Sequence, residues 1–250
     1  MKKLFASDFD NTLYIRNEGI LPKTADVIRR FQEAGNIFGI CTGRPVKSPR
    51  QHYEGVLDPD FIIGSSGGAI IDRDGKTLFE RTMPYELVRN LERMGRERSF
   101  AMAVHADGRF ILIAEDETAY AGMERIASIE TVRDLPMHGI SFLTGSLEGA
   151  KAFADEILAA YPDRVSIHLN RSAVDVAAAG CSKGIALRKI AEIFGADRTY
   201  GMGDSLNDLP LVKSADVGFT FAEAPEELKA AARHIVGNAA DAFDIALEDQ

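Results

Sequence analysis

Asp8 and Asp10 lie two residues apart at the end of a short apolar run, residues 3–9, which has the composition of a buried strand. Because side chains alternate along a strand, two carboxylates at this spacing project to the same side. One carboxylate could attack phosphorus as a covalent nucleophile, and the other could protonate the leaving oxygen and later deprotonate water. The same residues also suit a strand that runs into an Asx-type turn, so this motif leaves both interpretations open.

Two further motifs could hold a phosphate group. Thr42 and Gly43 follow a strand-like segment, residues 36–41, and a hydroxyl beside free backbone amides before a helix forms a cradle for phosphate oxygens. Lys183 stands at the start of a predicted helix, which is an unfavourable place for a cation and hints at a nearby anion. Simpler interpretations stay open, because Thr42 could cap a helix and Lys183 could be a solvated residue behind an N-cap at Ser182.

A fourth motif, residues 203–208, could bind a metal ion. Asp204 follows an apolar strand-like segment, and hard cations prefer oxygen ligands of this kind. The alternative is a capping box, because Ser205 is followed by Asp208 three residues later. That alternative explains Ser205 and Asp208 but gives no role to Asp204.

The elements that carry these motifs alternate between strands and helices. The pattern predicts strands at 3–9, 36–41, 61–64, 199–202, 217–219 and 234–236, and helices at 22–34, 45–53, 183–194, 206–213 and 225–233, before a terminal helix. Strands separated by helices of this length form parallel βαβ units, so we predict a doubly wound, Rossmann-like α/β core. Ligands bind at the carboxyl ends of such strands, where all four motifs are expected.

A different pattern occupies the middle of the chain. After a hairpin at 69–71 and 77–81, a helix at 85–98 precedes strands at 100–105 and 109–113, and a helix at 147–160 precedes strands at 165–169 and 173–177. Hairpins favour antiparallel pairing. We therefore predict that residues 82–179 form an inserted α+β domain, and that residues 1–81 and 180–250 form the catalytic core.

Composition narrows the class of partner. The chain has 250 residues and a formal net charge of −9, which disfavours nucleic acids and anionic membranes. Its two cysteines, Cys41 and Cys181, provide neither a disulfide framework nor a cysteine-rich zinc site. No apolar run reaches the roughly 18 residues of a spanning helix, and the first apolar stretch is too short for a signal peptide. We expect a cytoplasmic protein, and a monomer or weak dimer.

Together, and in this chain order, the four motifs resemble the haloacid dehalogenase-like (HAD) superfamily. The resemblance implies that Asp8 is the nucleophile and Asp10 the general acid and base. It implies a Mg²⁺ ion held by the Asp8 carboxylate, the Asp10 backbone carbonyl and Asp204, with Asp208 orienting the metal shell. It further implies that the transferring phosphoryl group is held by Thr42, Gly43, Lys183 and Asn207.

The position of the insertion, between Thr42 and Lys183, resembles the type IIB cap of the Cof-type phosphatases. This implies a phosphatase for small phosphorylated metabolites, with sugar phosphates as the first expectation and phosphorylated cofactors as the next. Gly67 departs from the pattern, because those relatives usually carry asparagine there, and we expect position 67 to lack a side chain that would face the substrate. The predicted substrate contacts are Arg44, Ser66, Gly67, His105, His168 and Arg171.

Two other functions stay open. A phosphomutase resembling phosphomannomutase would need basic residues in the cap that clamp a second phosphate, and the arginines there form no evident cluster in the sequence. A non-catalytic phosphosugar sensor would not need an acid such as Asp10 beside an intact nucleophile. The sequence therefore favours a Mg²⁺-dependent phosphatase over both.

Overall fold

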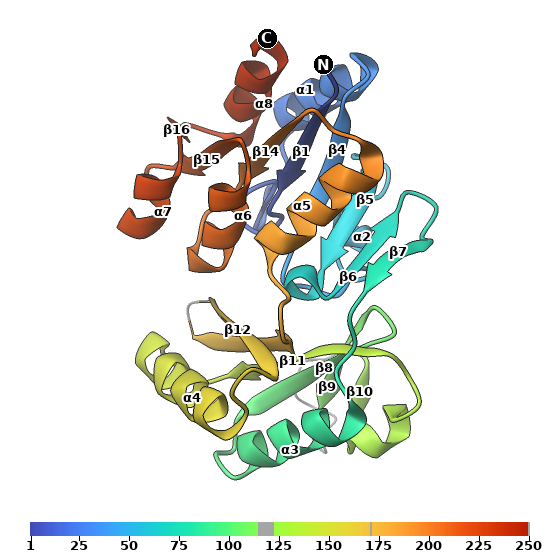
Figure 1. The fold of residues 1–250 in the computed structure, drawn as a ribbon, viewed down its shortest axis with the longest axis vertical. Coiled ribbons are helices and arrows are strands. Elements are labelled where there is room, and N and C mark those ends of the chain that lie inside the picture. Colours follow the sequence, from blue (N-terminus) through green and yellow to red (C-terminus); the bar gives the residue numbers. More distant parts are fainter. Residues whose placement is uncertain (115–122, 171, 250) are drawn as a thin grey trace.

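The chain folds around two β-sheets, one in the upper and one in the lower half of Figure 1. The computed structural model describes residues 1–114, 123–170 and 172–249. The larger sheet is built from the first and last parts of the chain, and the smaller sheet is formed by the middle of the chain.

The larger sheet is mostly parallel. Its strands run in the order β16 (His234–Val236), β15 (Val217–Phe221), β14 (Arg198–Met202), β1 (Lys3–Ser7), β4 (Ile37–Cys41), β5 (Phe61–Gly64), β6 (Ala69–Asp72) and β7 (Thr77–Glu80). The strands from β16 to β5 are parallel to one another, and β6 and β7 add an antiparallel hairpin next to β5 at one edge. All five residues of β1 are buried, as expected for a strand covered on both faces.

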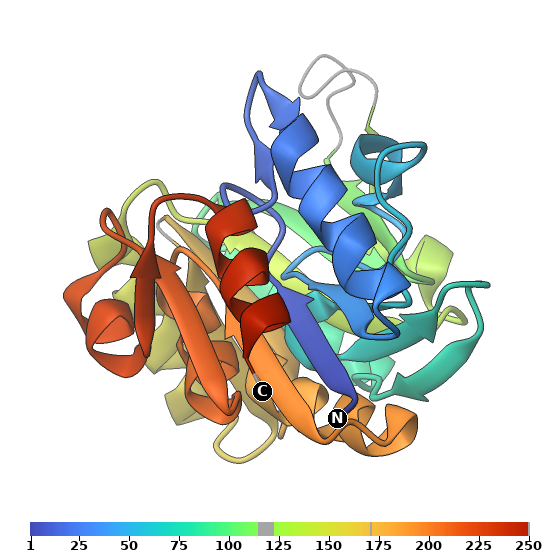
Figure 2. The ribbon, with the colours of Figure 1, turned by 90° about the horizontal axis from the view of Figure 1, so that it is seen from above.

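Helices cover both faces of this sheet. α1 (Pro22–Glu33) and α8 (Ala239–Glu248) lie side by side over β1 in Figure 2, where they pack with Phe5. The opposite face meets α5 (Lys183–Phe194), which packs with Leu4 and Ala6. α6 (Leu209–Ser214) and α7 (Glu226–Ala231) complete the layers. The alternation of Leu4, Phe5 and Ala6 between faces follows from the two-residue period of a strand.

The order of the strands places the chemical motifs together. From β1 the chain first builds β4 and β5 on one side, and it later returns to build β14, β15 and β16 on the other side. The direction in which strands are added to this doubly wound sheet therefore reverses at β1. At such a point a crevice forms at the carboxyl ends of the strands. The amide of Asp8, just after β1, donates to the carbonyl of Met202 at the end of β14 (2.8 Å).

The smaller sheet is antiparallel apart from one pair of strands. Its order is β10 (Arg125–Ile126), β9 (Arg109–Ile113), β8 (Ala101–Ala106), β11 (Met137–Leu143), β13 (Ala173–Ala178) and β12 (Val165–Asn170), and only β9 and β10 are parallel among these described strands. α3 (Tyr85–Arg96) and α4 (Leu147–Ala160) cover the face turned away from the larger sheet (Figure 1). Residues 82–179 thus lie between β7 and α5; their standing as a separate domain stays a prediction.

Two local features differ from the sequence prediction. The helix predicted over 45–53 is limited to α2 (Arg50–Tyr53), because Pro49 has no N–H to donate and marks the start of the helix. A hairpin of β2 (Tyr14–Ile15) and β3 (Gly19–Ile20) follows the first motif, and its strands are too short to show an alternating pattern. Short 3₁₀ turns η1 (Ser65–Gly67), η2 (Ile129–Val132) and η3 (Leu206–Asp208) complete the described elements.

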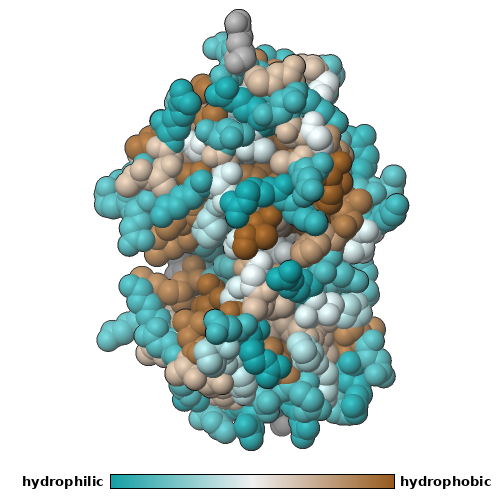
Figure 3. Space-filling view, in the orientation of Figure 1, coloured by the Kyte–Doolittle hydropathy of each residue, from teal (hydrophilic) through white to brown (hydrophobic). Residues whose placement is uncertain are grey.

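On the face shown in Figure 3, polar residues cover much of both halves, and some apolar residues lie near the place where the halves meet. Among the described helices, none combines the length and the apolar composition that crossing a bilayer would need.

Aromatic rings fill the space between β1 and the helices α1 and α8. The ring of Phe243 stacks on Phe5 with centroids 3.9 Å apart, and it meets the edges of Phe31 (5.6 Å) and Phe38 (5.7 Å). Phe243 is fully buried. This cluster holds the first strand, and therefore the loop that carries Asp8, against the helical layer.

Phe243→Ala is predicted to lower the free energy of unfolding by about 3–5 kcal/mol, because it removes a buried ring and leaves a cavity. Ile235→Ala is the control, since Ile235 is 56% exposed on the edge strand β16 and should cost about 0.5 kcal/mol or less. Urea denaturation measures both values. Equal losses for the two variants would contradict this account of the core.

Candidate active site

A buried lysine lies at the centre of the site. Lys183 is 0% exposed, and its Nζ donates to Oδ1 of Asp8 at 2.5 Å and to Oδ1 of Asp208. Burial alone would lower the pKa of Lys183, but the carboxylates of Asp208 and Asp8 outweigh burial and raise it well above its ordinary value. The side chain is therefore a permanent ammonium that links β1, α5 and η3.

Local sequence explains how α5 delivers this lysine. Ser182 caps the helix by accepting a hydrogen bond from the amide of Ile185 (3.1 Å). Gly184 lets the helix approach α6, because a Cβ at this position would lie 2.2 Å from the carbonyl oxygen of Pro210. The predicted N-cap at Ser182 is thus confirmed, but Lys183 behind it is buried and paired instead of solvated.

Three carboxylates meet beside Lys183. Asp8, Asp204 and Asp208 each offer an oxygen, and these oxygens all lie within 4.8 Å of one another. Oδ2 of Asp208 accepts the backbone amides of Asp204 and Ser205 (3.1 Å each). Gly203 allows this close packing, since a Cβ there would lie 2.3 Å from Asp208. The capping box proposed as an alternative is present, and the same Asp208 contacts the lysine with its other oxygen.

The carboxylates of this cluster repel one another. Burial and the neighbouring Asp208 raise the pKa of Asp8 well above its ordinary value, although Lys183 opposes the shift. Lys183 contacts the buried carboxylates of Asp8 and Asp208, and the carboxylate of Asp204 lies beside them. The donor set consists of oxygens, as a hard cation such as Mg²⁺ requires. The residues present fit a divalent cation in both charge and ligand type.

Asp10 and the phosphate-cradle residues border the cluster. Nε of Arg44 donates to Oδ2 of Asp10 at 2.8 Å, and its Nη2 contacts the other oxygen, so Arg44, predicted to contact substrate, pairs with Asp10. Thr42 is 1% exposed, and its Oγ1 accepts the amide of Arg44 (3.1 Å). Ser205 contacts Oδ1 of Asn207 through its hydroxyl (2.6 Å).

A cavity of about 340 Å³ joins the core motifs to the smaller sheet. Its core side is formed by Asp8, Asp10, Thr42, Gly43, Asp204 and Asn207. Its opposite side comes mostly from the strands β8, β9, β11 and β13, and Asn170 at the end of β12 and Met123 also line it. The structure therefore brings the predicted core motifs together around one space, while their chemical roles stay predictions.

The predicted substrate contacts differ in where they lie relative to the cavity. Arg44 and His105 line the cavity. Ser66 lies behind Gly43, with its hydroxyl 3.7 Å from the position that a Cβ on Gly43 would occupy. His168 is buried outside this lining, where burial and then the charge of Lys183 lower its pKa to about 4. Arg171 lies outside the described residues.

Gly67 differs from its expected role. A Cβ at this position would lie 2.5 Å from the carbonyl oxygen of Ser182, and the backbone φ of +97° suits glycine. A side chain at position 67 would therefore meet the backbone just before α5. Glycine here permits the close approach of η1 to the start of α5.

Sequence reasoning did not identify Ser141 and Asp175 as site residues. Both line the cavity, and the hydroxyl of Ser141 donates to Oδ1 of Asp175 at 2.5 Å. Antiparallel register pairs these residues directly across β11 and β13. The signal in the sequence that could have identified Asp175 is its place between two apolar residues, Val174 and Val176, in a predicted strand. Both valines are buried on the other face of β13.

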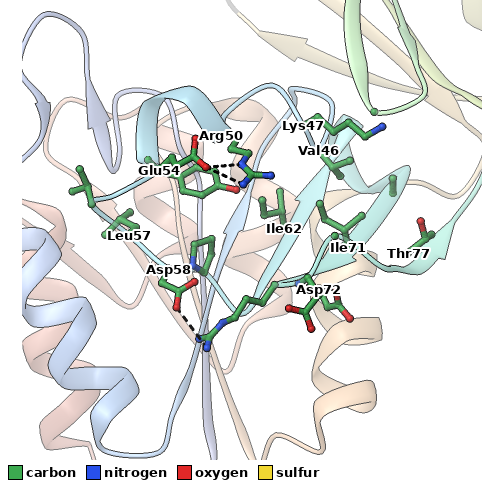
Figure 4. Close-up of a pocket in the computed structure, with 18 of the residues that line it drawn as sticks. Val46, Lys47, Arg50, Glu54, Leu57, Asp58, Ile62, Ile71, Asp72 and Thr77 are labelled. Carbon is green, nitrogen blue, oxygen red and sulfur yellow. Dashed lines mark hydrogen bonds and ion pairs between the residues drawn. The ribbon is translucent and has the colours of Figure 1, made fainter.

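A larger cavity, of about 1,210 Å³, lies beside α2, β5 and β6 (Figure 4). Its charged side chains pair with one another, as in Arg50 with Glu54 (2.9 Å) and Arg73 with Asp58 (3.5 Å). None of the three clustered carboxylates lines it. The smaller cavity is therefore the candidate active site.

The chain is also similar to known proteins over nearly its whole length. A family model of haloacid dehalogenase-like hydrolases matches residues 5–243. The HMP-PP phosphatase of Escherichia fergusonii is 25% identical over 94% of this chain and 89% of its own length.

Solved structures show the same fold. A haloacid dehalogenase-like hydrolase from B. subtilis has a TM-score of 0.86 at 16% identity and covers 99% of this chain and 98% of its own. The HAD subclass IIB sugar phosphatase BT4131 has a TM-score of 0.80 at 19% identity, with coverage of 99% and 98%. These neighbours confirm the predicted fold class, a parallel-sheet core with a cap.

Acid is predicted to destabilise the protein through its buried histidines. Burial, and then the nearby His138, lower the pKa of His105 from 6.5 to about 3. The folded state thus keeps this ring neutral, while the unfolded chain takes up a proton below pH 6.5, so its stabilising contribution is present above that pH and is lost as pH falls toward 3. One such histidine should cost about 2 kcal/mol between pH 7 and pH 5.

His105→Gln should therefore flatten the pH dependence of unfolding by that amount, as measured by urea denaturation from pH 7 to pH 5. His234→Gln, on the edge strand β16, is the control and should keep the wild-type slope. A His105→Gln slope equal to that of the wild type would show that the ring is not held neutral.

Proposed function

Because the chain belongs to the haloacid dehalogenase-like hydrolase family, we propose that it is a Mg²⁺-dependent phosphatase acting on small phosphorylated metabolites through an aspartyl-phosphate on Asp8. The observation that carries the proposal is the meeting of Asp8, Asp204 and Asp208 within 4.8 Å of one another, beside the ammonium of Lys183. The family assignment also agrees with the resemblance seen in the sequence.

In this proposal the carboxylate of Asp8 attacks phosphorus, and a covalent intermediate divides one difficult hydrolysis into two easier transfers. Asp8, Asp204 and the Asp10 carbonyl would hold Mg²⁺, with Asp208 orienting the shell, and the bound ion would neutralise oxygens that otherwise repel an anionic nucleophile. Lys183 holds one Asp8 oxygen at 2.5 Å, which fixes the direction of the carboxylate.

The transferring phosphoryl group would lie against the core side of the cavity. Thr42 supplies a hydroxyl, Gly43 an amide and Lys183 an ammonium, and Asn207 adds a polar contact. Such fixed donors stabilise the negative charge that spreads over the equatorial oxygens of the phosphoryl group.

Asp10 is proposed to protonate the leaving oxygen and then to deprotonate the attacking water. Support comes from its ion pair with Arg44, which directs the carboxylate at the edge of the cavity. Arg44 is then a positioning residue for Asp10.

The proposed substrate class rests on the cavity and on the names of the relatives, an HMP-PP phosphatase and a sugar phosphatase. The phosphomutase alternative receives less support, because two of the described cap arginines are paired with acids. Arg109 contacts Glu124 and Arg133 contacts Glu130, each at 2.6 Å. We further propose a cytoplasmic monomer or weak dimer, in keeping with the free cysteines Cys41 and Cys181.

Substitution of Asp8 and substitution of Asp10 are predicted to impair the hydrolysis of p-nitrophenyl phosphate in different ways. Asp8→Asn should lower kcat at least about a thousandfold, because it removes the nucleophile. Asp10→Asn should release about one equivalent of p-nitrophenol in a fast burst and then turn over slowly, since this leaving group needs no acid but the phosphoenzyme still needs a base. Stopped-flow absorbance in Mg²⁺ and in EDTA measures both phases.

The wild type should lose its activity in EDTA and regain it on addition of Mg²⁺. A folded Asp8→Asn protein with near wild-type turnover would rule out the aspartyl-phosphate. Activity that is indifferent to EDTA would rule out the metal.

A further inference from the structure

We propose that Asp175 is a specificity-determining residue, and that the cavity accepts a phosphomonoester whose leaving group is a compact, mostly apolar ring carrying one hydrogen-bond donor. This inference rests on the proposed phosphatase function and names the substrate class of the same site.

A chain of hydrogen bonds fixes the orientation of Asp175. A carboxylate only accepts, so Ser141 donates its hydroxyl proton to Oδ1 of Asp175 (2.5 Å). Ser141 then accepts from Nε2 of His105 (2.9 Å), and Nδ1 of the neutral ring accepts from the hydroxyl of Ser65 (3.1 Å). These hydrogen bonds run from η1 of the core to the smaller sheet. They fix Oδ1 of Asp175, and Oδ2 points away from Ser141.

Oδ2 of Asp175 belongs to a group of polar atoms above Gly43. A Cβ on Gly43 would lie 3.4 Å from Oδ2 of Asp175, 3.7 Å from Oγ of Ser66 and 4.0 Å from Nδ2 of Asn207. Three polar atoms thus surround one small space next to the proposed phosphoryl position. Glycine keeps that space open.

Ser66 gives independent support for a ligand in this space. Its side chain is 1% exposed, and within the described residues its Oγ has no hydrogen-bond partner. A buried hydroxyl without a partner costs free energy. A substrate group in the space above Gly43 would supply the missing hydrogen bond, and Oδ2 of Asp175 would accept from a donor on the same group.

The rest of the cap side of the cavity is mostly apolar. It includes Ala101, Ala103, Phe110, Leu112 and Leu143. Among the described polar residues on that side, His105 and Ser141 are already engaged in the hydrogen bonds to Asp175, and Asn170 lies at the exposed end of β12. A polyhydroxylated sugar would bury hydroxyls against apolar walls, which is unfavourable, whereas an aromatic or heteroaromatic ring would not. The volume of about 340 Å³ is at the small end for ligand sites.

A matched pair of synthetic esters tests the inference. 3-Aminobenzyl phosphate and 3-methylbenzyl phosphate have nearly the same shape, but only the first carries a donor. The wild type should favour the amino compound in kcat/KM by at least about tenfold, because an unmatched acceptor at Asp175 penalises the methyl compound. Glucose 6-phosphate should be slower than 3-methylbenzyl phosphate, since its hydroxyls meet the apolar wall.

Asp175→Asn should bring the amino-to-methyl ratio to about one or below, because the amide keeps an oxygen for Ser141 and turns a donor toward the cavity. Asp155→Asn is the control; Asp155 is exposed on α4, and this variant should keep the wild-type ratio. Ser141→Ala is a second variant and should lower the ratio by releasing Asp175 from its fixed orientation. Denaturation midpoints show which variants fold.

A wild-type ratio near one, or a preference that survives in folded Asp175→Asn, would overturn the inference. Faster hydrolysis of glucose 6-phosphate than of 3-methylbenzyl phosphate would overturn the apolar part of it. If the wild type hydrolyses both benzyl esters equally, the phosphatase proposal stands and only the inference fails. If neither ester nor p-nitrophenyl phosphate is hydrolysed with Mg²⁺ present, the proposed function itself fails.

Discussion

The contact of one buried ammonium with two carboxylates is the interaction on which the rest of the structure depends. Lys183 contacts Asp8, which lies 175 residues earlier in the sequence, and Asp208, which lies 25 residues later. Burying such charges is costly, and it is tolerated when they are paired and hydrogen-bonded. Asp204 adds a third carboxylate within 4.8 Å of the others. The fold thus gathers three carboxylates at a place whose oxygen ligands suit a divalent cation.

The topology of the larger sheet makes this concentration possible. The strand order reverses at β1, so the ends of β1, β14 and β4 lie next to one another, and each carries part of the site. The smaller sheet supplies the opposite wall of the cavity. This division assigns the chemistry to loops fixed by parallel strands, and it assigns the choice of leaving group to the side chains of the cap strands.

The core of the site was predictable because its signals are local. A strand that ends in Asp8 or Asp204, or a helix that begins at Lys183, is visible within a few residues, and the doubly wound sheet then brings such ends together. Even the alternative interpretation was informative, since Asp208 both caps η3 and contacts Lys183. The cap contacts were not predictable in this way. His105, Ser141 and Asp175 meet only through the register of β8, β11 and β13, and the backbone contact that requires Gly67 comes from a segment more than a hundred residues away.

The central claim is that these carboxylates share one divalent cation, and calorimetric titration with Mg²⁺ tests it most directly. The account predicts saturable binding of about one ion per chain in the wild type, weakened at least about tenfold in Asp204→Asn, because one of few charged oxygen ligands is lost. Asp155→Asn should bind as the wild type does. Absence of saturable binding in the folded wild type, or equal affinity in Asp204→Asn, would contradict the claim.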